Sequence, residues 1–174
     1  MPHFSLNPRL RRGSAMIEFT LAGVAATVLV ISTFQLGMVM WNYHTLTMAV
    51  HEATRYVAVK GAGCTLPGNT CSVTVGTITA KIASWGIGIP AGGVNITLKT
   101  NSGAVTKCTP LNSCFTSPTV WPPSANSDNQ PGSLITISAE YHVNPALLFF
   151  WPGRQAQSYG SFWLPASSSQ QILF

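Results

Sequence analysis

The feature that most constrains the fold of this chain is a long run without a charged side chain close to its N-terminus. The run extends from Phe19 to Trp41 and reads FTLAGVAATVLVISTFQLGMVMW. With a rise of ~1.5 Å per residue, an α-helix of this length spans about 34 Å, more than the hydrocarbon core of a bilayer at about 30 Å. The run therefore predicts a transmembrane helix.

The helical pattern continues past the apolar run into an amphipathic stem. No proline occurs from Arg9 to Leu66. Between Asn42 and Lys60, apolar residues recur at the spacing of one helix face. These residues are Leu46, Val50, Ala53 and Val57. We therefore expect one continuous helix, with its first half in lipid and its second half outside the membrane.

The remainder of the chain, residues 61–174, has a different composition, with most of the prolines and all four cysteines. Val94–Lys99 and Ile135–Val143 alternate apolar and polar residues, which is the pattern of half-buried strands. Thr74–Gly86 fits two patterns: its Thr and Val content favours a strand, whereas its apolar residues share one helical face. We expect a short helix with Thr74 near its N-cap. These patterns predict an α+β protein with a short antiparallel sheet.

Two further segments of this part have distinctive compositions. Cys108–Gly132 is rich in Pro, Ser and Asn, which is typical of a long surface loop. Ala146–Trp151 is an apolar run, ALLFFW. We expect this run to pack against the stem or against a neighbouring subunit.

The basic residues before the apolar run predict the topology. Arg9, Arg11 and Arg12 precede the membrane segment, and positively charged flanks stay on the cytoplasmic side. The N-terminus is therefore expected in the cytoplasm, with the bulk of the chain across the membrane.

The cysteines agree with this topology, because an even number confined to the outer part is typical of an oxidising compartment. Four cysteines allow three connectivities. We expect the neighbouring pairs that close the shortest loops, Cys64 with Cys71 and Cys108 with Cys114. Structural zinc sites place their paired cysteines closer together than this, so the sequence predicts no metal site.

The junction RRGSAMIEF, just before the apolar run, is the most informative motif. Gly13 ends a basic leader, and Glu18 follows five residues later at the edge of the apolar helix. A carboxylate costs about 2.5–3.5 kcal/mol at the bilayer centre and less near a helix end, so a compensating group is expected. The alternatives are a cleaved signal peptide, a plain signal anchor and a chance helix-end carboxylate.

This junction resembles a type IV pilin-class processing site. The resemblance implies that a prepilin peptidase cuts after Gly13, so that Ser14 becomes the N-terminus and Glu18 the fifth mature residue. It also implies that Glu18 faces the free amine of a neighbouring subunit during assembly. A glycine suits the cut because it has no Cβ to keep the protease away from the backbone.

Over about Arg11 to Lys60 the chain resembles the TadE-like minor pilins, or pseudopilins, of the tight-adherence (Flp) pilus. The matching residues at the front are Gly13, Ala15, Glu18 and Phe19. The stem ends in VHEATRY, where the family often reads close to A-R-E-G-A-R-Y. Glu52, Arg55 and Tyr56 match this pattern, whereas His51, Ala53 and Thr54 depart from it. Beyond Lys60 the chain is only broadly similar to the family, with a closing strand followed by a Pro-bearing turn and a C-terminal Ser-rich tail.

The resemblance implies a role in pilus assembly and surface adhesion. It divides the chain into a leader (1–13), a transmembrane and stem helix (14–60) and a periplasmic or extracellular domain (61–174). The implied partners are a prepilin peptidase, other pilin or pseudopilin subunits, the pilus assembly machinery and the inner membrane. Glu18 and Phe19 are the residues expected to act in processing and assembly.

The same residues argue against other classes of function. Only 7% of residues are charged, against roughly a quarter in ordinary soluble domains, which disfavours a conventional cytosolic enzyme. The four acids are scattered, and the sequence contains no G-x-S-x-G, no H-E-x-x-H and no phosphate loop, so we expect no enzyme, catalytic residue or cofactor. His44 and His51 share a helix face, but two histidines do not make a metal site. Basic residues of the outer part are too sparse for nucleic acid.

Two alternatives remain open from the sequence. One is a single-pass, membrane-anchored periplasmic binding module that never assembles into a pilus and keeps its N-terminal residues. The other is an anchored hydrolase with an unrecognised Ser or His constellation, in which only His142 lies in the outer domain.

Overall fold

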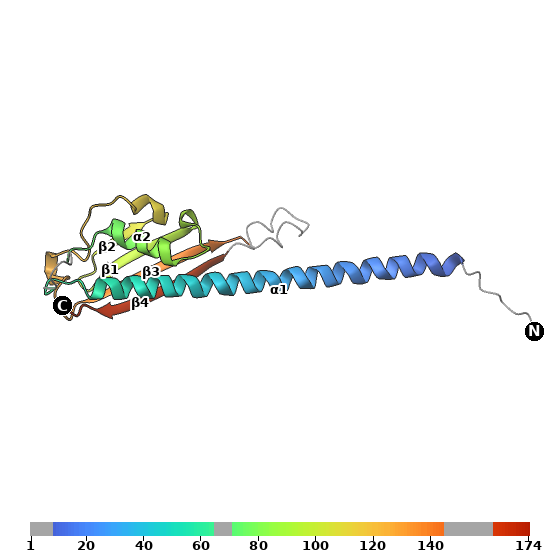
Figure 1. Cartoon of the computed structure of the whole chain (residues 1–174), viewed down its shortest axis with the longest axis horizontal. Helices are drawn as coiled ribbons and strands as arrows, with labels where there is room; N and C mark the ends of the chain where they lie inside the picture. The colour runs from blue at the N-terminus through green and yellow to red at the C-terminus, as the bar shows by residue number, and fades with distance from the viewer. Residues whose placement is uncertain (1–8, 65–70, 145–161) are drawn as a thin grey trace, which may run out of the picture. The chain divides into compact units, whose positions relative to one another are not determined.

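A computed structural model of the chain describes residues 9–64, 71–144 and 162–174 (Figure 1), with the backbone alone for residues 9–14. It contains two compact units, Met1–Met38 and Val39–Phe174. The expected packing of the apolar run Ala146–Trp151 falls outside the described residues.

Helix α1 runs from Arg9 to Ala58 and contains the predicted transmembrane segment. It confirms the long N-terminal helix expected from the absence of proline. The first unit consists of its N-terminal part, and the second unit begins at Val39, within the same helix.

The second unit is built on a four-stranded antiparallel sheet in the order β2-β1-β3-β4 (Figure 1). Its strands are β1 (Val94–Thr100), β2 (Val105–Cys108), β3 (Leu134–Val143) and β4 (Phe162–Gln171). A short helix, α2 (Val75–Trp85), precedes the sheet. The α+β fold class predicted from the sequence is confirmed.

The alternating residues of β1 and β3 explain why these strands form the centre of the sheet. Ile96 lies opposite Ala139 and Leu98 opposite Ile137, and all four side chains are buried. Because side chains alternate between the faces of a strand, the intervening polar residues lie on the other face. The predicted strands are therefore confirmed, each with one apolar face.

The last turns of α1 belong to the same core as the sheet. The residues predicted to lie on one helical face, Leu46, Val50, Ala53 and Val57, are all at most 1% exposed. They form one cluster with residues of α2 and of the two central strands. On the sheet side this cluster includes Ile96, Leu98, Ile135 and Ile137. The amphipathic half of the stem is thus part of the folded domain, which extends back into α1.

Helix α2 begins as its sequence predicts. The Thr74 hydroxyl accepts a hydrogen bond from the Thr77 backbone N–H at 3.2 Å, and the Thr77 hydroxyl in turn accepts one from the Thr74 N–H at 3.1 Å. This reciprocal capping satisfies two backbone donors at a helix start. It decides the choice between helix and strand for this segment in favour of the helix.

Two segments differ from their predictions. The expectation of a C-terminal Ser-rich tail is wrong, because this segment forms strand β4, which pairs with β3 along its whole length. The segment Cys108–Gly132 is more than a surface loop, since Leu111, Trp121 and Asp128 are at most 2% exposed. Strand β2 was not predicted at all. Partners distant in sequence supply the structure of β4 and of the buried residues before β3, whereas β2 pairs with β1 in a short hairpin.

Both predicted disulfides are formed. Cys64 is bonded to Cys71 and Cys108 to Cys114, with Cα–Cα distances of 5.6 and 5.8 Å. Both cross-links lie in the second unit, and the Cys108 bond joins the end of β2 to the short 3-10 turn that follows it.

Soon after the end of α1 the chain passes through Gly61, where the structure leaves no space for a larger residue. A Cβ built on Gly61 lies 2.0 Å from the Phe174 carbonyl oxygen and 2.2 Å from Ile172 Cγ2. The Ala58 carbonyl oxygen also accepts a hydrogen bond from the Leu173 N–H at 2.8 Å. The end of α1 is therefore fixed against the C-terminal strand.

Candidate functional site: the apolar helix and its acidic residue

The apolar run of α1 is exposed in the described structure. Phe19 is 81% exposed and Leu21 76%. The helix Ala15–Ala58 is long and apolar enough to cross a membrane, and none of its most apolar window is buried among the described residues. A helix that is apolar all round belongs in lipid or against other protein surfaces. This surface is therefore completed by something other than the described part of the chain.

The hydroxyl groups of this segment are satisfied within the helix. Thr27 donates to the Gly23 carbonyl at 2.8 Å, and Ser32 donates to the Val28 carbonyl at 2.6 Å. Thr33 donates to the Val30 carbonyl. Because unsatisfied polar groups are costly in hydrocarbon, these bonds make the segment compatible with the bilayer interior.

The residues of the predicted processing site lie at the start of this helix. Gly13 and Ser14 have helical backbone within α1. Glu18 and Phe19 follow on the next turn, and both are exposed. The helix therefore presents one carboxylate beside a large apolar surface, where burial requires a positively charged or hydrogen-bonding partner.

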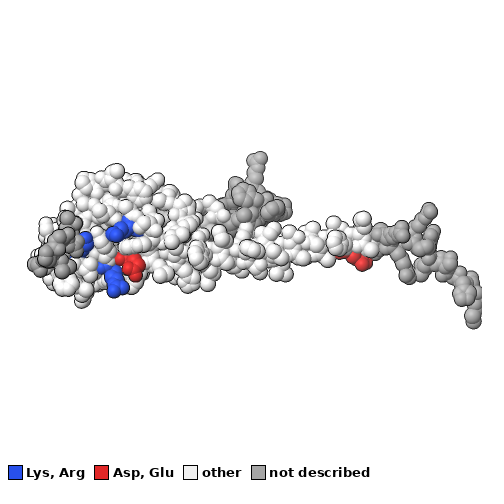
Figure 2. All heavy atoms as spheres, viewed as in Figure 1, with Lys and Arg blue, Asp and Glu red and all other residues white. Residues whose placement is uncertain are grey.

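The end of the stem, where the family motif lies, carries a small basic and aromatic cluster. Lys60 Nζ lies 4.6 Å from the centre of the Tyr56 ring, and Lys81 Nζ lies 4.7 Å from it. Lys81 also lies 5.1 Å from the Trp85 ring. Figure 2 shows Lys and Arg side chains beside an acidic one in this region. The cluster joins α1 to α2, which gives Tyr56 a structural role that its helical position alone did not indicate.

The two stem histidines are exposed and contact other side chains of the described structure. His44 makes an edge contact with Tyr43, and His51 Nδ1 lies 3.3 Å from the Ser168 hydroxyl of β4. Within residues 15–64, 71–144 and 162–174, no three His, Cys, Asp or Glu side chains group as metal ligands would.

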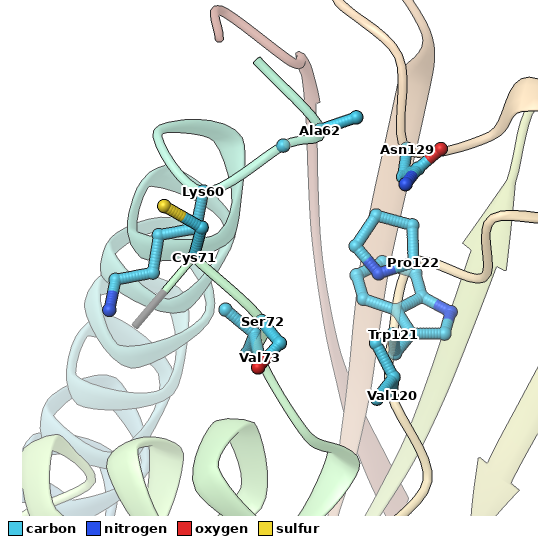
Figure 3. A pocket seen from close by; sticks show the side chains of 10 residues that line it. Lys60, Ala62, Cys71, Ser72, Val73, Val120, Trp121, Pro122 and Asn129 are labelled. Atoms are coloured by element: carbon cyan, nitrogen blue, oxygen red, sulfur yellow. The ribbon is translucent and has the colours of Figure 1, made fainter. Parts of the chain in front are cut away.

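A cavity of about 220 Å³ lies beside the end of α1 (Figure 3). Trp121 and Pro122 form one wall, and Lys60, Cys71 and Val73 contribute to the rest. In Figure 3 the indole nitrogen of Trp121 is directed away from the Lys60 side of the cavity. Lys60 is the one charged residue of the described lining, and Ser72, Trp121 and Asn129 add polar groups. Trp121 Nε1 and Asn129 Oδ1 are buried and have no hydrogen-bond partner among the described residues.

Asp128 is a buried carboxylate that the sequence did not single out. It accepts a hydrogen bond from the Thr100 hydroxyl at 2.7 Å and from the Ser102 backbone N–H at 3.1 Å, and it also accepts one from the Ser102 hydroxyl. Burial raises its pKa, but the three hydrogen bonds outweigh burial and hold the pKa of this carboxyl below its usual value. The group fixes the β1–β2 turn to the loop and has no catalytic geometry.

Because this pKa is lowered on folding, ionised Asp128 stabilises the protein above its unfolded pKa of about 3.9, and this stabilisation is lost as the pH falls through the folded pKa. Asp128→Asn is expected to lower the free energy of unfolding by about 1–3 kcal/mol at pH 7, with a smaller difference near pH 3. Thermal unfolding of the full chain in detergent measures both values. Glu140→Gln, at an exposed position of β3, is the control, and an equal loss there contradicts the assignment.

Comparison with known proteins adds one finding to this geometry. Neither curated proteins nor solved structures gave a match to the chain. Residues 13–55, which begin at the glycine of the junction and include the exposed apolar helix and most of the stem, do match the family described as TadE-like protein, which confirms the resemblance drawn from the sequence.

Proposed function

We propose that this chain is a minor pilin or pseudopilin of a tight-adherence pilus, processed by a prepilin peptidase and required for pilus assembly and surface adhesion. The proposed precursor consists of a leader (1–13), a transmembrane and stem helix (14–60) and an outer domain (61–174). The TadE-like match over residues 13–55 supports the relation to this pilus system.

The observation that carries the proposal is the uncovered apolar helix. The described outer domain has a core of its own, to which only the later turns of α1 contribute. The earlier turns expose large apolar side chains such as Phe19, Leu21 and Phe34. In the proposed pathway this surface has two successive environments. Lipid covers it while the subunit is in the membrane, and helices of neighbouring subunits cover it after extraction. The role is structural and involves no catalysis.

The proposed topology places the N-terminus in the cytoplasm and the outer domain in the periplasm. Arg9, Arg11 and Arg12 support the first part, because basic flanks remain inside. The two disulfides of the second unit support the other part, because such bonds persist in oxidising compartments. After assembly the domain is displayed at the pilus or the cell surface.

The mass of the mature protein tests this proposal. Produced in cells with a prepilin peptidase, the chain is expected to lack residues 1–13 and to begin at Ser14. Without the peptidase, the same chain is expected to keep its leader. Retention of the leader in both cells supports the alternative function, an anchored binding module that never assembles.

A further inference from the structure

One end of the second unit carries exposed apolar side chains from elements that are far apart in the sequence. Trp41, at which the apolar run of α1 ends, is exposed, and so is Tyr43. A Cβ built on Gly88 lies 3.9 Å from the Trp41 Nε1 atom. The turn after α2 therefore lies beside Trp41, and its residue Ile87 is also exposed.

The sheet adds two aromatic residues at the same end. β4 runs in the same direction as α1, because contacts join the two elements in the same order. These contacts are His51 with Ser168 and Ala58 with Leu173. Phe162 precedes Ser168 by six residues, about 20 Å of strand, which equals about 13 residues of helix before His51. β4 therefore begins about level with Trp41 (Figure 1), and its first residues, Phe162 and Trp163, are exposed.

The segments that form this end carry no charge. Within the described residues, the segments 39–51, 85–94 and 162–171 contain no Asp, Glu, Lys or Arg. On β3 the last charged residue is Glu140, which lies opposite Pro165 and is therefore farther from this end than Trp163 is. The exposed residues of this surface, the aromatic end, are Trp41, Tyr43, Ile87, Phe162 and Trp163.

α1 leaves no linker between a membrane and the folded part of the second unit. Leu46 is the first core residue of the helix. It follows Trp41 by five residues of unbroken helix, about 7.5 Å. On each side of a bilayer the polar headgroup layer is about 5–8 Å thick. A bilayer that covers the apolar run therefore brings its headgroup layer to the aromatic end.

We propose that the aromatic end docks on the surface of the bilayer that α1 spans, with Trp41, Ile87 and Trp163 among the lipid headgroups. Trp and Tyr side chains favour this layer, because their rings are apolar and their N–H or O–H groups find polar partners there. Lipid is the occupant because the aromatic end is continuous with the apolar run, which lipid covers in the proposed membrane placement.

Docking holds the second unit at one depth and tilt, because α1, the turn after α2 and the start of β4 all meet the same layer. Extraction of the subunit from the membrane then breaks this contact as well as releasing the apolar run. The inference rests on the proposed membrane placement of α1. It holds whether or not the leader is removed or a pilus is assembled.

Fluorescence quenching of the full chain in phosphatidylcholine nanodiscs, with one chain in each disc, tests the docking. The four native cysteines are all in disulfides, so an introduced cysteine supplies the one free thiol for a fluorophore. A nitroxide on the lipid headgroup is expected to quench a label at Ile87→Cys severalfold more than one at Leu173→Cys. Ile87 is 69% exposed and Leu173 62%, but Leu173 lies beside Ala58, where α1 ends. Iodide in the water is expected to quench the two labels in the reverse order.

A second pair of labels tests the sheet. Trp163 and Val105 are both 49% exposed and lie on the same face of the sheet, toward opposite ends. The headgroup nitroxide is expected to quench a label at Trp163→Cys severalfold more than one at Val105→Cys. Equal quenching of these two labels overturns the proposal, because the helix alone then reaches the headgroup layer.

A fifth label separates the docking from the membrane placement. Val30 is exposed in the middle of the apolar run, and a nitroxide halfway along the acyl chain is expected to quench a label at Val30→Cys. If it does, and the Ile87 label is as open to iodide as the Leu173 label, the docking alone is overturned. An unquenched Val30 label overturns the membrane placement and the docking with it. Headgroup quenching at Ile87 that requires two chains in a disc overturns the docking in favour of contact with another subunit.

Discussion

Replacing Gly13 with alanine is expected to leave the leader attached, so that the protein keeps its 13 N-terminal residues in cells that contain a prepilin peptidase. Gly13 has helical backbone in α1. Its peptide group must leave the helix before a protease reaches it, because helical carbonyls are bonded to the N–H four residues on. Glycine weakens a helix by about 0.5–1 kcal/mol relative to alanine and puts no Cβ before the protease. Alanine removes both advantages.

Gly23→Ala is the matched control for this prediction. Gly23 lies in the same helix, and a Cβ built there meets nothing within 4 Å. We expect this variant to be processed as the unchanged chain is, with the mature protein again beginning at Ser14. Intact-mass spectrometry measures the mass of each variant and shows whether residues 1–13 have been removed. A Gly13→Ala protein that still loses residues 1–13 contradicts the assignment of Gly13 to the cleavage site.

The elements that the sequence predicted are those whose pattern is local. Thr74 and Thr77 supply both halves of the α2 cap from neighbouring positions. β1 and β3 alternate cleanly because one face of each is buried in the core. The apolar run of α1 is evident because lipid-facing segments exclude charge over their whole length. In these cases the residues that determine the element lie within it.

β4 was missed because its pattern depends on its partner. Its core-facing positions include Ser168 and Gln170, which lie opposite Ile137 and Ile135 of β3. Polar residues at such positions remove the alternation that marks a half-buried strand. The strand forms because β3 offers a complete ladder of backbone groups, a contact that is distant in the sequence.

The segment before β3 was misjudged for the same reason. The Trp121 N–H donates to the Val73 carbonyl, and the Val75 N–H donates to the Thr119 carbonyl, each at 2.8 Å. These bonds hold a Pro- and Ser-rich stretch against the start of α2 and bury Trp121. The composition of the stretch correctly excluded long elements but gave no sign of these contacts.

The processing site was predicted from the sequence alone. It stays a prediction, because none of the described contacts tests it. The match over residues 13–55 supports the resemblance, and Glu18 is an exposed residue near the start of the helix. What the fold adds is a reason for the order of events. The core of the second unit includes only the later turns of α1, so in the proposed pathway this unit folds before the apolar run leaves the membrane.

Replacing Glu18 with glutamine is expected to block assembly without blocking cleavage. In the proposed contact, the carboxylate pairs with the amine of Ser14 on a neighbouring subunit, inside an apolar bundle where both charges are desolvated. Removing one member of such a pair costs about 2–5 kcal/mol, and each 1.4 kcal/mol is a factor of ten in affinity. We therefore expect subunit association to fall tenfold or more, measured as pili recovered from cells that carry only the variant.

Two further variants serve as controls for this prediction. Glu18→Asp keeps the negative charge and is expected to retain part of the assembly. Glu52→Gln removes a carboxylate from the later, partly buried turns of α1 and is expected to leave piliation unchanged. Glutamine also lowers the cost of holding residue 18 in the bilayer, so the Glu18→Gln subunit should accumulate in the membrane, cut but unassembled. Normal piliation of Glu18→Gln contradicts the pairing, whereas an uncut subunit moves the role of Glu18 to recognition by the peptidase.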